Sequence, residues 1–183
     1  MGQWNQSAAT HPALAVSIRR AAPNDVDVLF KLVRTCVENM RSRGIDQWDE
    51  MYPDIVTIEL DVRSGTAFLA SVAGEVVGTL VLNEHQDPEY SEVAWQFAAG
   101  RVAVIHRLMI QPAMEGKGIA RVFMRFAEQR ALSSEYRSIR LDAFTGNPRA
   151  LRLYERLGYR DAGSVRFRKG EFRCFEKDLG TAG

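Results

Sequence analysis

Two glycines, Gly116 and Gly118, separate an apolar run that ends at Ile110 from a stretch with helical periodicity. A helix that begins at such a turn leaves its first backbone N–H groups unpaired, and its macrodipole adds partial positive charge at the same end. Because glycine has no Cβ, the backbone itself can approach an anion. The turn predicts a phosphate-binding cradle, although an ordinary strand-to-helix turn would carry the same glycines.

A second motif begins about thirty residues later, where Asn147 and Pro148 open another helical segment that ends at Gly158. Proline in the first turn and glycine just after the last turn are typical helix boundaries. Together the two motifs resemble the GNAT superfamily of acetyl-CoA-dependent N-acetyltransferases. The residues that carry the resemblance are Gly116, Gly118, Ile119, Ala120, Asn147, Ala150, Tyr154, Gly158 and Tyr159. It spans roughly residues 16–179.

The hydrophobic pattern predicts alternating strands and helices. Strands are expected at 16–19, 66–72, 76–82, 101–110, 138–144, 160–166 and 172–177, and helices at 23–44, 53–63, 118–132 and 148–157. The helix over 118–132 should bury Val122, Phe123, Phe126 and Ala127. The segment 83–100 is long for a connection, so we expect it to be functional or mobile. The resemblance implies an α/β (α+β) fold, with a mixed, mostly antiparallel sheet of six to seven strands, about four flanking helices and splayed central strands.

Composition sets further limits. The chain has 183 residues, 46% of them apolar, which suits one acetyltransferase domain over 16–183 preceded by a disordered leader over 1–15. Its 24 basic and 23 acidic residues give a net charge of +1, so we expect neither nucleic acid nor a membrane as partner. Cys36 and Cys174 lack metal-site spacing, which predicts buried thiols and no metal. Without a secretory signal or an apolar run of about 20 residues, a cytoplasmic location is expected.

The resemblance implies acetyl-CoA as the cofactor. The turn and the following helix would bind its pyrophosphate, and the strand before the turn would splay at a bulge and pair with the pantetheine arm. One N–H group of that strand would face the developing oxyanion. The expected cofactor-binding residues are Leu108, Met109, Ile110, Glu115, Gly116, Lys117, Gly118, Ile119, Ala120, Arg121, Asn147, Ala150 and Tyr154.

Two positions depart from the family pattern. Ala113 replaces the usual Gln or Arg, and Glu115 stands where Arg or Gln is common. A carboxylate beside a pyrophosphate is unfavourable unless it points to solvent, so Glu115 is expected to contribute only its backbone. The cradle itself consists of main-chain atoms, which do not depend on either side chain.

Tyr154 is the candidate for protonating the departing thiolate. A phenol has a reference pKa of about 10, so it still carries its proton at neutral pH. The structural alternative is that Tyr154 packs one face of its helix with Leu151 and Leu157. For Asn147, a contact to the cofactor arm and a helix-capping role can coexist.

The catalytic base has two candidates. An alkyl ammonium has a pKa of about 10.4, so a base or a water chain must remove its proton. His106 lies on the strand that borders the expected cleft and matches a strand histidine of arylalkylamine N-acetyltransferases. Asp142 ends the next strand and is an alternative base or substrate anchor. Each would otherwise be structural: His106 as a hydrogen-bonded residue, Asp142 as a cap or a partner of Arg140 or Arg107.

The acceptor is expected to be a small-molecule amine or a peptide amine. Gln47, Trp48 and Tyr52 lie between the first two helices, which form one wall of the acceptor site in the family. An aromatic side chain there would hold a cationic amine, helped by Asp46, Asp49 or Glu50. Alternatively, Trp48 fills the core. Trp95 and Phe97 offer a second aromatic surface or a dimer contact, and since dimers are common in the family a homodimer stays open.

Two other classes of function remain to be weighed. A catalytically weak or inactive regulatory module of the same fold would bind acyl-CoA without turnover, and Ala113 leaves room for it. A nucleotide-dependent phosphotransferase would need Gly-x-x-x-x-Gly-Lys-Ser/Thr, whereas this turn reads Gly-Lys-Gly-Ile and lacks the metal-binding hydroxyl. The sequence therefore favours an acyl-CoA site.

Overall fold

The computed structural model describes residues 14–180, and these contain one sheet of seven strands. The strands are β1 (Val16–Arg20), β2 (Ala67–Val72), β3 (Glu75–Asn83), β4 (Val102–Ile110), β5 (Ser138–Phe144), β6 (Arg160–Phe167) and β7 (Gly170–Asp178). Their order is β1-β2-β3-β4-β5-β7-β6, and only the β4–β5 pair is parallel.

Four α-helices connect the strands: α1 (Val26–Ser42), α2 (Ile55–Arg63), α3 (Ile119–Ser133) and α4 (Pro148–Arg156). Three short 3-10 turns accompany them, η1 (Pro23–Asp25), η2 (Pro88–Glu92) and η3 (Pro112–Met114). Side-chain oxygens cap two of the helices: Asp54 accepts from Thr57 N at 2.8 Å, and Asn147 accepts from Ala150 N at 3.2 Å. The predicted fold class is confirmed.

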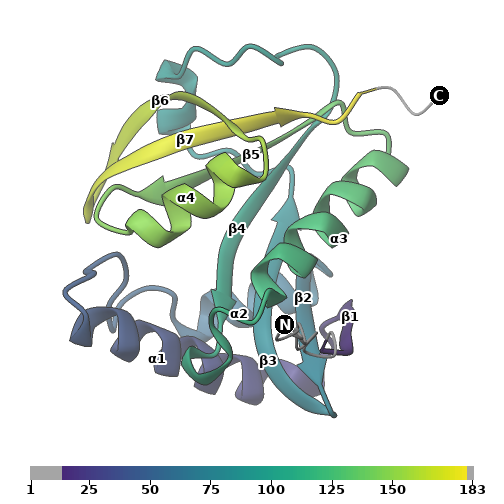
Figure 1. Ribbon diagram of the computed structural model, residues 1–183, viewed down its shortest axis with the longest axis vertical. Coiled ribbons are helices and arrows are strands. Elements are labelled where there is room, and N and C mark those ends of the chain that lie inside the picture. Colours follow the sequence, from purple (N-terminus) through teal and green to yellow (C-terminus); the bar gives the residue numbers. More distant parts are fainter. Residues whose placement is uncertain (1–13, 181–183) are drawn as a thin grey trace, which may run out of the picture.

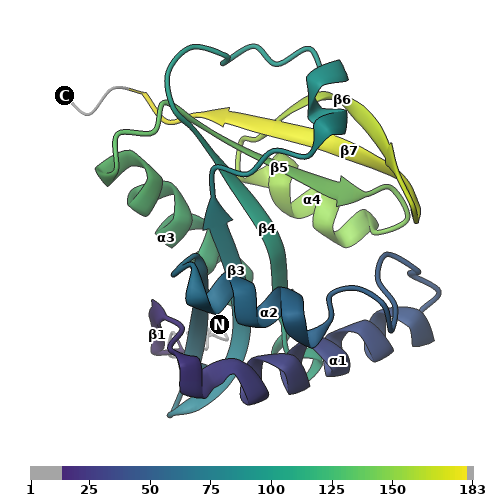
Figure 2. The ribbon, with the colours of Figure 1, turned by 180° about the vertical axis from the view of Figure 1, so that it is seen from behind.

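The two faces of the sheet are covered differently. Helices α3 and α4 cover one face (Figure 1), and α1 and α2 cover the β1–β4 half of the other (Figure 2). The segment between β3 and β4, which includes η2, covers the remaining half, where Tyr90 packs with Val104, Phe172 and Cys174. The long connection is therefore a layer of the fold.

The prediction for the buried face of α3 was wrong at one residue. Phe123 and Ala127 are fully buried and Phe126 is partly buried, but Val122 is 37% exposed. The buried stripe begins at Ile119 and continues through Phe123, Ala127 and Ala131, which turns Val122 toward solvent.

The central strands diverge, as the resemblance implied. Pairing of β4 with β5 ends at Val104 and Arg140, although β4 continues to Ile110 and β5 to Phe144 (Figure 1). A bulge lies just beyond: the register of β3 with β4 shifts between Thr79 and Val81, and Arg107 adopts a left-handed φ of 50°. Because a bulge bends its strand, it carries the rest of β4 away from β5.

The leader expected over 1–15 lies, apart from its last two residues, outside the described part of the chain. Within residues 14–180, none of the helices combines the length and the apolar character that crossing a membrane requires.

Candidate active site

A cleft with a volume of about 910 Å³ opens where β4 and β5 diverge. Its walls come from β4, the turn before α3, the end of β5, α4 and the segment between α1 and α2. The predicted site residues that line it are Gln47, Trp48, Tyr52, His106, Leu108, Met109, Ile110, Glu115, Gly116, Gly118, Ile119, Ala120, Arg121, Asp142, Asn147, Ala150 and Tyr154. Lys117 lies off this lining, with its Nζ 3.3 Å from Met114 Sδ.

The turn before α3 has the geometry of an anion cradle. Gly116 and Gly118 have φ of 79° and 86°, a backbone region that residues other than glycine adopt only with steric strain. Gly118 is the N-cap of α3 and supplies no side-chain oxygen, so the first N–H groups of the helix have no capping side chain, and Ile119, Ala120 and Arg121 line the cleft. This arrangement fits a phosphate group.

The edge of β4 that faces the cleft has the geometry to receive an extended chain. Beyond Val104 the strand keeps its bonds to β3 but has no partner in β5. At its end, Cys36 Sγ donates to Ile110 O at 3.3 Å, and burial raises the pKa of Cys36 to about 12, so the thiol keeps its proton. An unpaired strand edge beside an anion cradle fits the pantetheine arm and pyrophosphate of an acyl-CoA.

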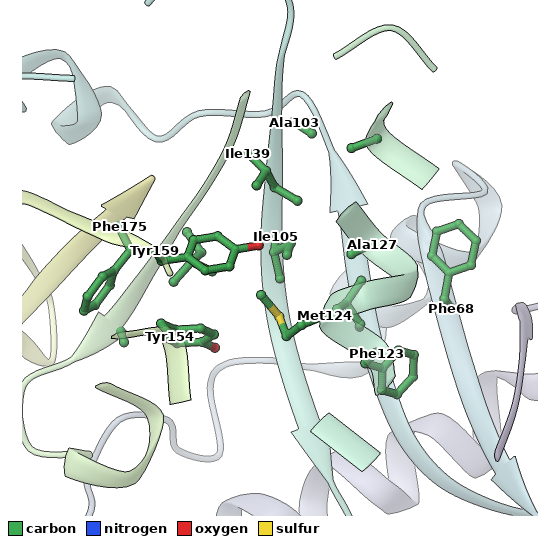
Figure 3. Packing of buried hydrophobic residues seen from close by; sticks show 14 of the residues in the cluster. Phe68, Ala103, Ile105, Phe123, Met124, Ala127, Ile139, Tyr154, Tyr159 and Phe175 are labelled. Carbon is green, nitrogen blue, oxygen red and sulfur yellow. The ribbon is translucent and has the colours of Figure 1, made fainter. Parts of the chain in front are cut away.

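Tyr154 combines packing with access to the cleft. Tyr154 is 7% exposed, and its ring lies beside those of Tyr159 and Phe175, at centroid distances of 6.1 and 5.8 Å (Figure 3). Burial, and then the charge of Asp142, raise the pKa of Tyr154 above its usual value. The phenol therefore stays protonated throughout the physiological range. The two roles weighed for it are compatible.

Asp142 holds a hydrogen bond that the sequence analysis missed. Tyr90 Oη, in η2, donates to Asp142 Oδ1 at 2.7 Å. Burial raises the pKa of Asp142 to about 6; the bond from Tyr90 lowers it in part, and the charge of Asp87 raises it. A carboxyl group with this pKa is close to the range where a general base works well at neutral pH.

Buried polar contacts fix the segment that carries Tyr90. The carboxylate of Glu176, which is 1% exposed, accepts from the N–H groups of Gln96 and Phe97 at 2.7 and 3.2 Å. Trp95 Nε1 donates to Tyr90 O at 2.9 Å, and the Trp95 ring lies 4.2 Å from the Arg140 guanidinium. Trp95 thus packs inward. The only sequence signal for this layer was the unusual length of the connection.

His106 is held on one side of its ring. Its Nε2 lies 3.1 Å from both Asn83 Oδ1 and His85 O, and since both are acceptors, Nε2 carries the proton and Nδ1 the lone pair. Burial, and then the charge of Arg107, lower the pKa of His106 to about 4. The imidazole is therefore neutral at pH 7 and a weak base.

An ion pair at the bulge was also missed. Arg107 donates from Nε and Nη2 to the Asp61 carboxylate at 3.0 and 2.6 Å, with both side chains nearly buried. Its Nη1 donates to Tyr52 Oη at 2.5 Å. Arg107 thereby links the bulge to α2 and to the expected acceptor wall.

The segment 45–52 is tied to the opposite side of the cleft. Asp49 is 7% exposed and accepts from Arg168 at 2.9 and 3.0 Å, and Lys169 Nζ lies 2.9 Å from it. These cations hold the pKa of Asp49 well below its usual range. Asp46 accepts from Lys169 at 3.0 Å. Two of the acidic residues expected to attract an amine, Asp46 and Asp49, are therefore already paired with the β6–β7 turn, and the third, Glu50, is paired with Arg41 of α1.

The remaining acceptor candidates have mixed surroundings. Trp48 packs partly buried against the core under α1 and α2, and it also lines the cleft. Gln47 Oε1 accepts from Asn147 Nδ2 at 3.4 Å, which connects the acceptor wall to the N-cap of α4.

No group of three His, Cys, Asp or Glu side chains suited to a metal ion occurs between residues 14 and 180.

Comparison with known proteins identifies the class. Residues 33–159 match the model of the acetyltransferase (GNAT) family, and the chain belongs to this family. No protein of curated function matches the sequence.

Solved structures share the fold. A GNAT-family acetyltransferase from Streptococcus agalactiae superposes with a TM-score of 0.79 at 23% identity, over 89% of this chain and 95% of that one. The ribosomal-protein alanine N-acetyltransferase from Escherichia coli gives 0.65 at 12% identity, over 92% and 96%. A spermidine N-acetyltransferase chimera from Vibrio cholerae and hSSAT gives 0.65 at 17% identity, over 90% and 95%.

Proposed function

We propose that this protein is an N-acetyltransferase that transfers an acetyl group from acetyl-CoA to a primary amine, by direct attack in a ternary complex. Residues 16–183 would form one catalytic domain acting in the cytoplasm. One observation carries the proposal: the unpaired edge of β4, the cradle at Gly116 and Gly118, Tyr154 and Asp142 all line the same cleft.

Acetyl-CoA supplies the reactive acetyl thioester when it is bound. The N–H groups at the start of α3 would hold its pyrophosphate, and the backbone of β4 from Leu108 to Ile110 would align its pantetheine arm. Asn147 and Ala150, at the first turn of α4, would form the other wall. The pyrophosphate and pantetheine contacts would use main-chain atoms, so Ala113 would not preclude binding.

Asp142 would take the proton from the acceptor ammonium. With a pKa of about 6 it is ionised at neutral pH, and it lines the cleft beside the divergence of the strands. An alkyl ammonium has a pKa of about 10.4, so the transfer to Asp142 is uphill by less than a transfer to His106, whose pKa is about 4. His106 would then bind or orient the acceptor.

Tyr154 would return a proton to the leaving sulfur. Its hydroxyl is protonated over the whole working range, and the burial that raises its pKa would also raise the pKa of a thiolate formed beside it. The ring packing against Tyr159 and Phe175 fixes the direction of the hydroxyl.

The acceptor would be a small-molecule amine or a peptide amine, bound against Gln47, Trp48 and Tyr52. Proteins of this fold act on acceptors as different as a ribosomal-protein alanine and spermidine. The wall formed by residues 45–52 is therefore the place to look for selectivity.

A thiol-release assay tests the proposal. The purified protein is mixed with acetyl-CoA and, one at a time, small amines, amino acids, polyamines and peptides with a free N-terminus, and acetylated product is identified by mass spectrometry. We expect amine-dependent thiol release with at least one acceptor. Binding of acetyl-CoA without release in any mixture would instead support the regulatory module.

A further inference from the structure

The Glu115 carboxylate lies between two arginines at the phosphate end of the cleft. Arg149, in the first turn of α4, donates from Nη1 to Glu115 Oε2, and Arg43, at the C-cap of α1, donates to the same oxygen at 3.2 Å. The side chain of Glu115 is 28% exposed. The carboxylate thus joins the turn to two helices rather than pointing freely into solvent.

Arg149 extends over the cradle itself. A Cβ built on Gly116 would lie 3.8 Å from Arg149 Nη2, the nitrogen next to the one that binds Glu115. Glu115, Arg149 and Arg43 all line the cleft. The guanidinium groups are therefore within reach of an anion seated at the start of α3.

Three more arginines line the cleft. Arg121 comes from α3, and Arg152 and Arg156 come from α4. None of the three forms an ion pair with a carboxylate in the part of the chain that the structure describes. With Arg43 and Arg149, five arginines from α3, α4 and the end of α1 thus line the cleft, in a chain whose net charge is only +1.

We propose that Glu115 is an internal placeholder anion, which holds Arg43 and Arg149 until the nucleotide phosphates of acyl-CoA displace it. On binding, the two guanidinium groups pass from the carboxylate to phosphate oxygens, which match their planar donor geometry. Arg121, Arg152 and Arg156 add to the attraction. Glu115 then lowers the affinity for the nucleotide half and leaves the affinity for the pantetheine half unchanged. This inference rests on the proposed function, because it takes acyl-CoA as the ligand.

Calorimetric titration with coenzyme A and with S-acetylpantetheine, which lacks the nucleotide, tests the exchange. Glu115→Gln should bind coenzyme A about fivefold more tightly, the scale expected of a partly exposed ion pair, and S-acetylpantetheine equally well. Arg149→Gln should weaken coenzyme A binding, and by a larger factor in the Glu115→Gln background, where no carboxylate competes for it. Glu155→Gln is the matched control. Glu155 lies on α4, as Arg149 does, and is paired with Arg173 at 3.1 Å, but it does not line the cleft.

The outcomes separate the two proposals. If the unmodified protein binds coenzyme A but Glu115→Gln binds it equally or more weakly, the placeholder role is wrong and the proposed function stands. If Glu155→Gln tightens binding as much as Glu115→Gln, the effect is one of overall charge and the role is again wrong. If the unmodified protein binds no coenzyme A, the proposed function fails, and the placeholder role fails with it.

Discussion

The Tyr90 hydroxyl lies 2.7 Å from Asp142 Oδ1, a hydrogen bond that joins the long segment between β3 and β4 to the strand bordering the cleft. The bond lowers the pKa of Asp142, whereas burial raises it. It gives the segment a definite part in the site, because the layer that covers the sheet also adjusts the acidity of the proposed base.

Replacing Tyr90 with Phe should raise the pKa of Asp142 further. Since the carboxylate is the active form, activity falls as the pH drops through this pKa, and the acidic limb of the kcat/KM profile should move from near pH 6 to higher pH by about one unit. Tyr136→Phe is the control, because Tyr136 donates to Glu84 at 2.7 Å on the exposed surface. An unmoved limb in Tyr90→Phe would remove Asp142 from the base role.

Asp142→Asn should slow the reaction by about 10²- to 10⁴-fold, the usual contribution of a general base.

Asp142→Asn should also raise the free energy of unfolding at pH 8, by about 2 kcal/mol, because the folded state disfavours the ionised carboxylate there. This gain begins above the unfolded pKa, is complete above pH 6, and vanishes below about pH 4. Urea unfolding at pH 8 and pH 4 measures it, and equal stabilities of variant and parent at pH 8 would contradict the buried-charge account.

His106→Gln keeps a donor near the position of Nε2, which serves Asn83 Oδ1 and His85 O. If Asp142 is the base, this variant should lose much less than the 10²-fold typical of a removed base, and its acidic limb should stay near pH 6. Steady-state rates across pH decide the matter. A loss as deep as that of Asp142→Asn, with the limb abolished, would assign the base to His106 instead.

Tyr154→Phe should lower kcat by about 10²-fold, with little change in the KM for acetyl-CoA, because it removes a proton donor and keeps the ring. Tyr159→Phe is a matched control from the same aromatic cluster, since Tyr159 does not line the cleft. Rapid-mix measurement of thiol release would compare them. An unchanged kcat in Tyr154→Phe would mean that water or another group protonates the sulfur.

The bulge in β4 should depend on the ion pair between Arg107 and Asp61. Asp61→Asn leaves a nearly buried guanidinium without its counter-charge and should lower the free energy of unfolding by about 3 kcal/mol. Asp178→Asn breaks a more exposed pair with Arg137 and should lower it by less than about 1 kcal/mol. Equal losses in the free energy of unfolding, measured with urea, would show that the pair at the bulge stabilises the fold no more than an exposed pair does.

The parts of the site that the sequence predicts are those encoded by neighbouring residues. Gly116 and Gly118 mark a turn, and Asn147, Pro148 and Gly158 mark the ends of a helix, because each acts through its own backbone. The resemblance supplied the divergence of β4 from β5, which no local pattern encodes.

The parts that escaped prediction are contacts between side chains far apart in the chain. Tyr90 meets Asp142, Asp61 meets Arg107, and Asp49 meets Arg168 only after the sheet has formed. Hydrophobic periodicity does not specify polar partners, so Asp49 was expected to be available to a cationic amine. The prediction that Val122 is buried was wrong for a related reason, because the side chains that α3 buries depend on the strands it packs against.

Hydrogen–deuterium exchange with and without acetyl-CoA tests most directly whether the cleft between β4 and β5 is the acyl-CoA site. Saturating acetyl-CoA should slow exchange in 108–110, where β4 has no partner on its β5 side, and in 116–121, at the uncapped start of α3. The amides of β1, none of whose residues lines the cleft, should not change. Saturable binding that protects other segments and leaves these two unprotected would contradict the account.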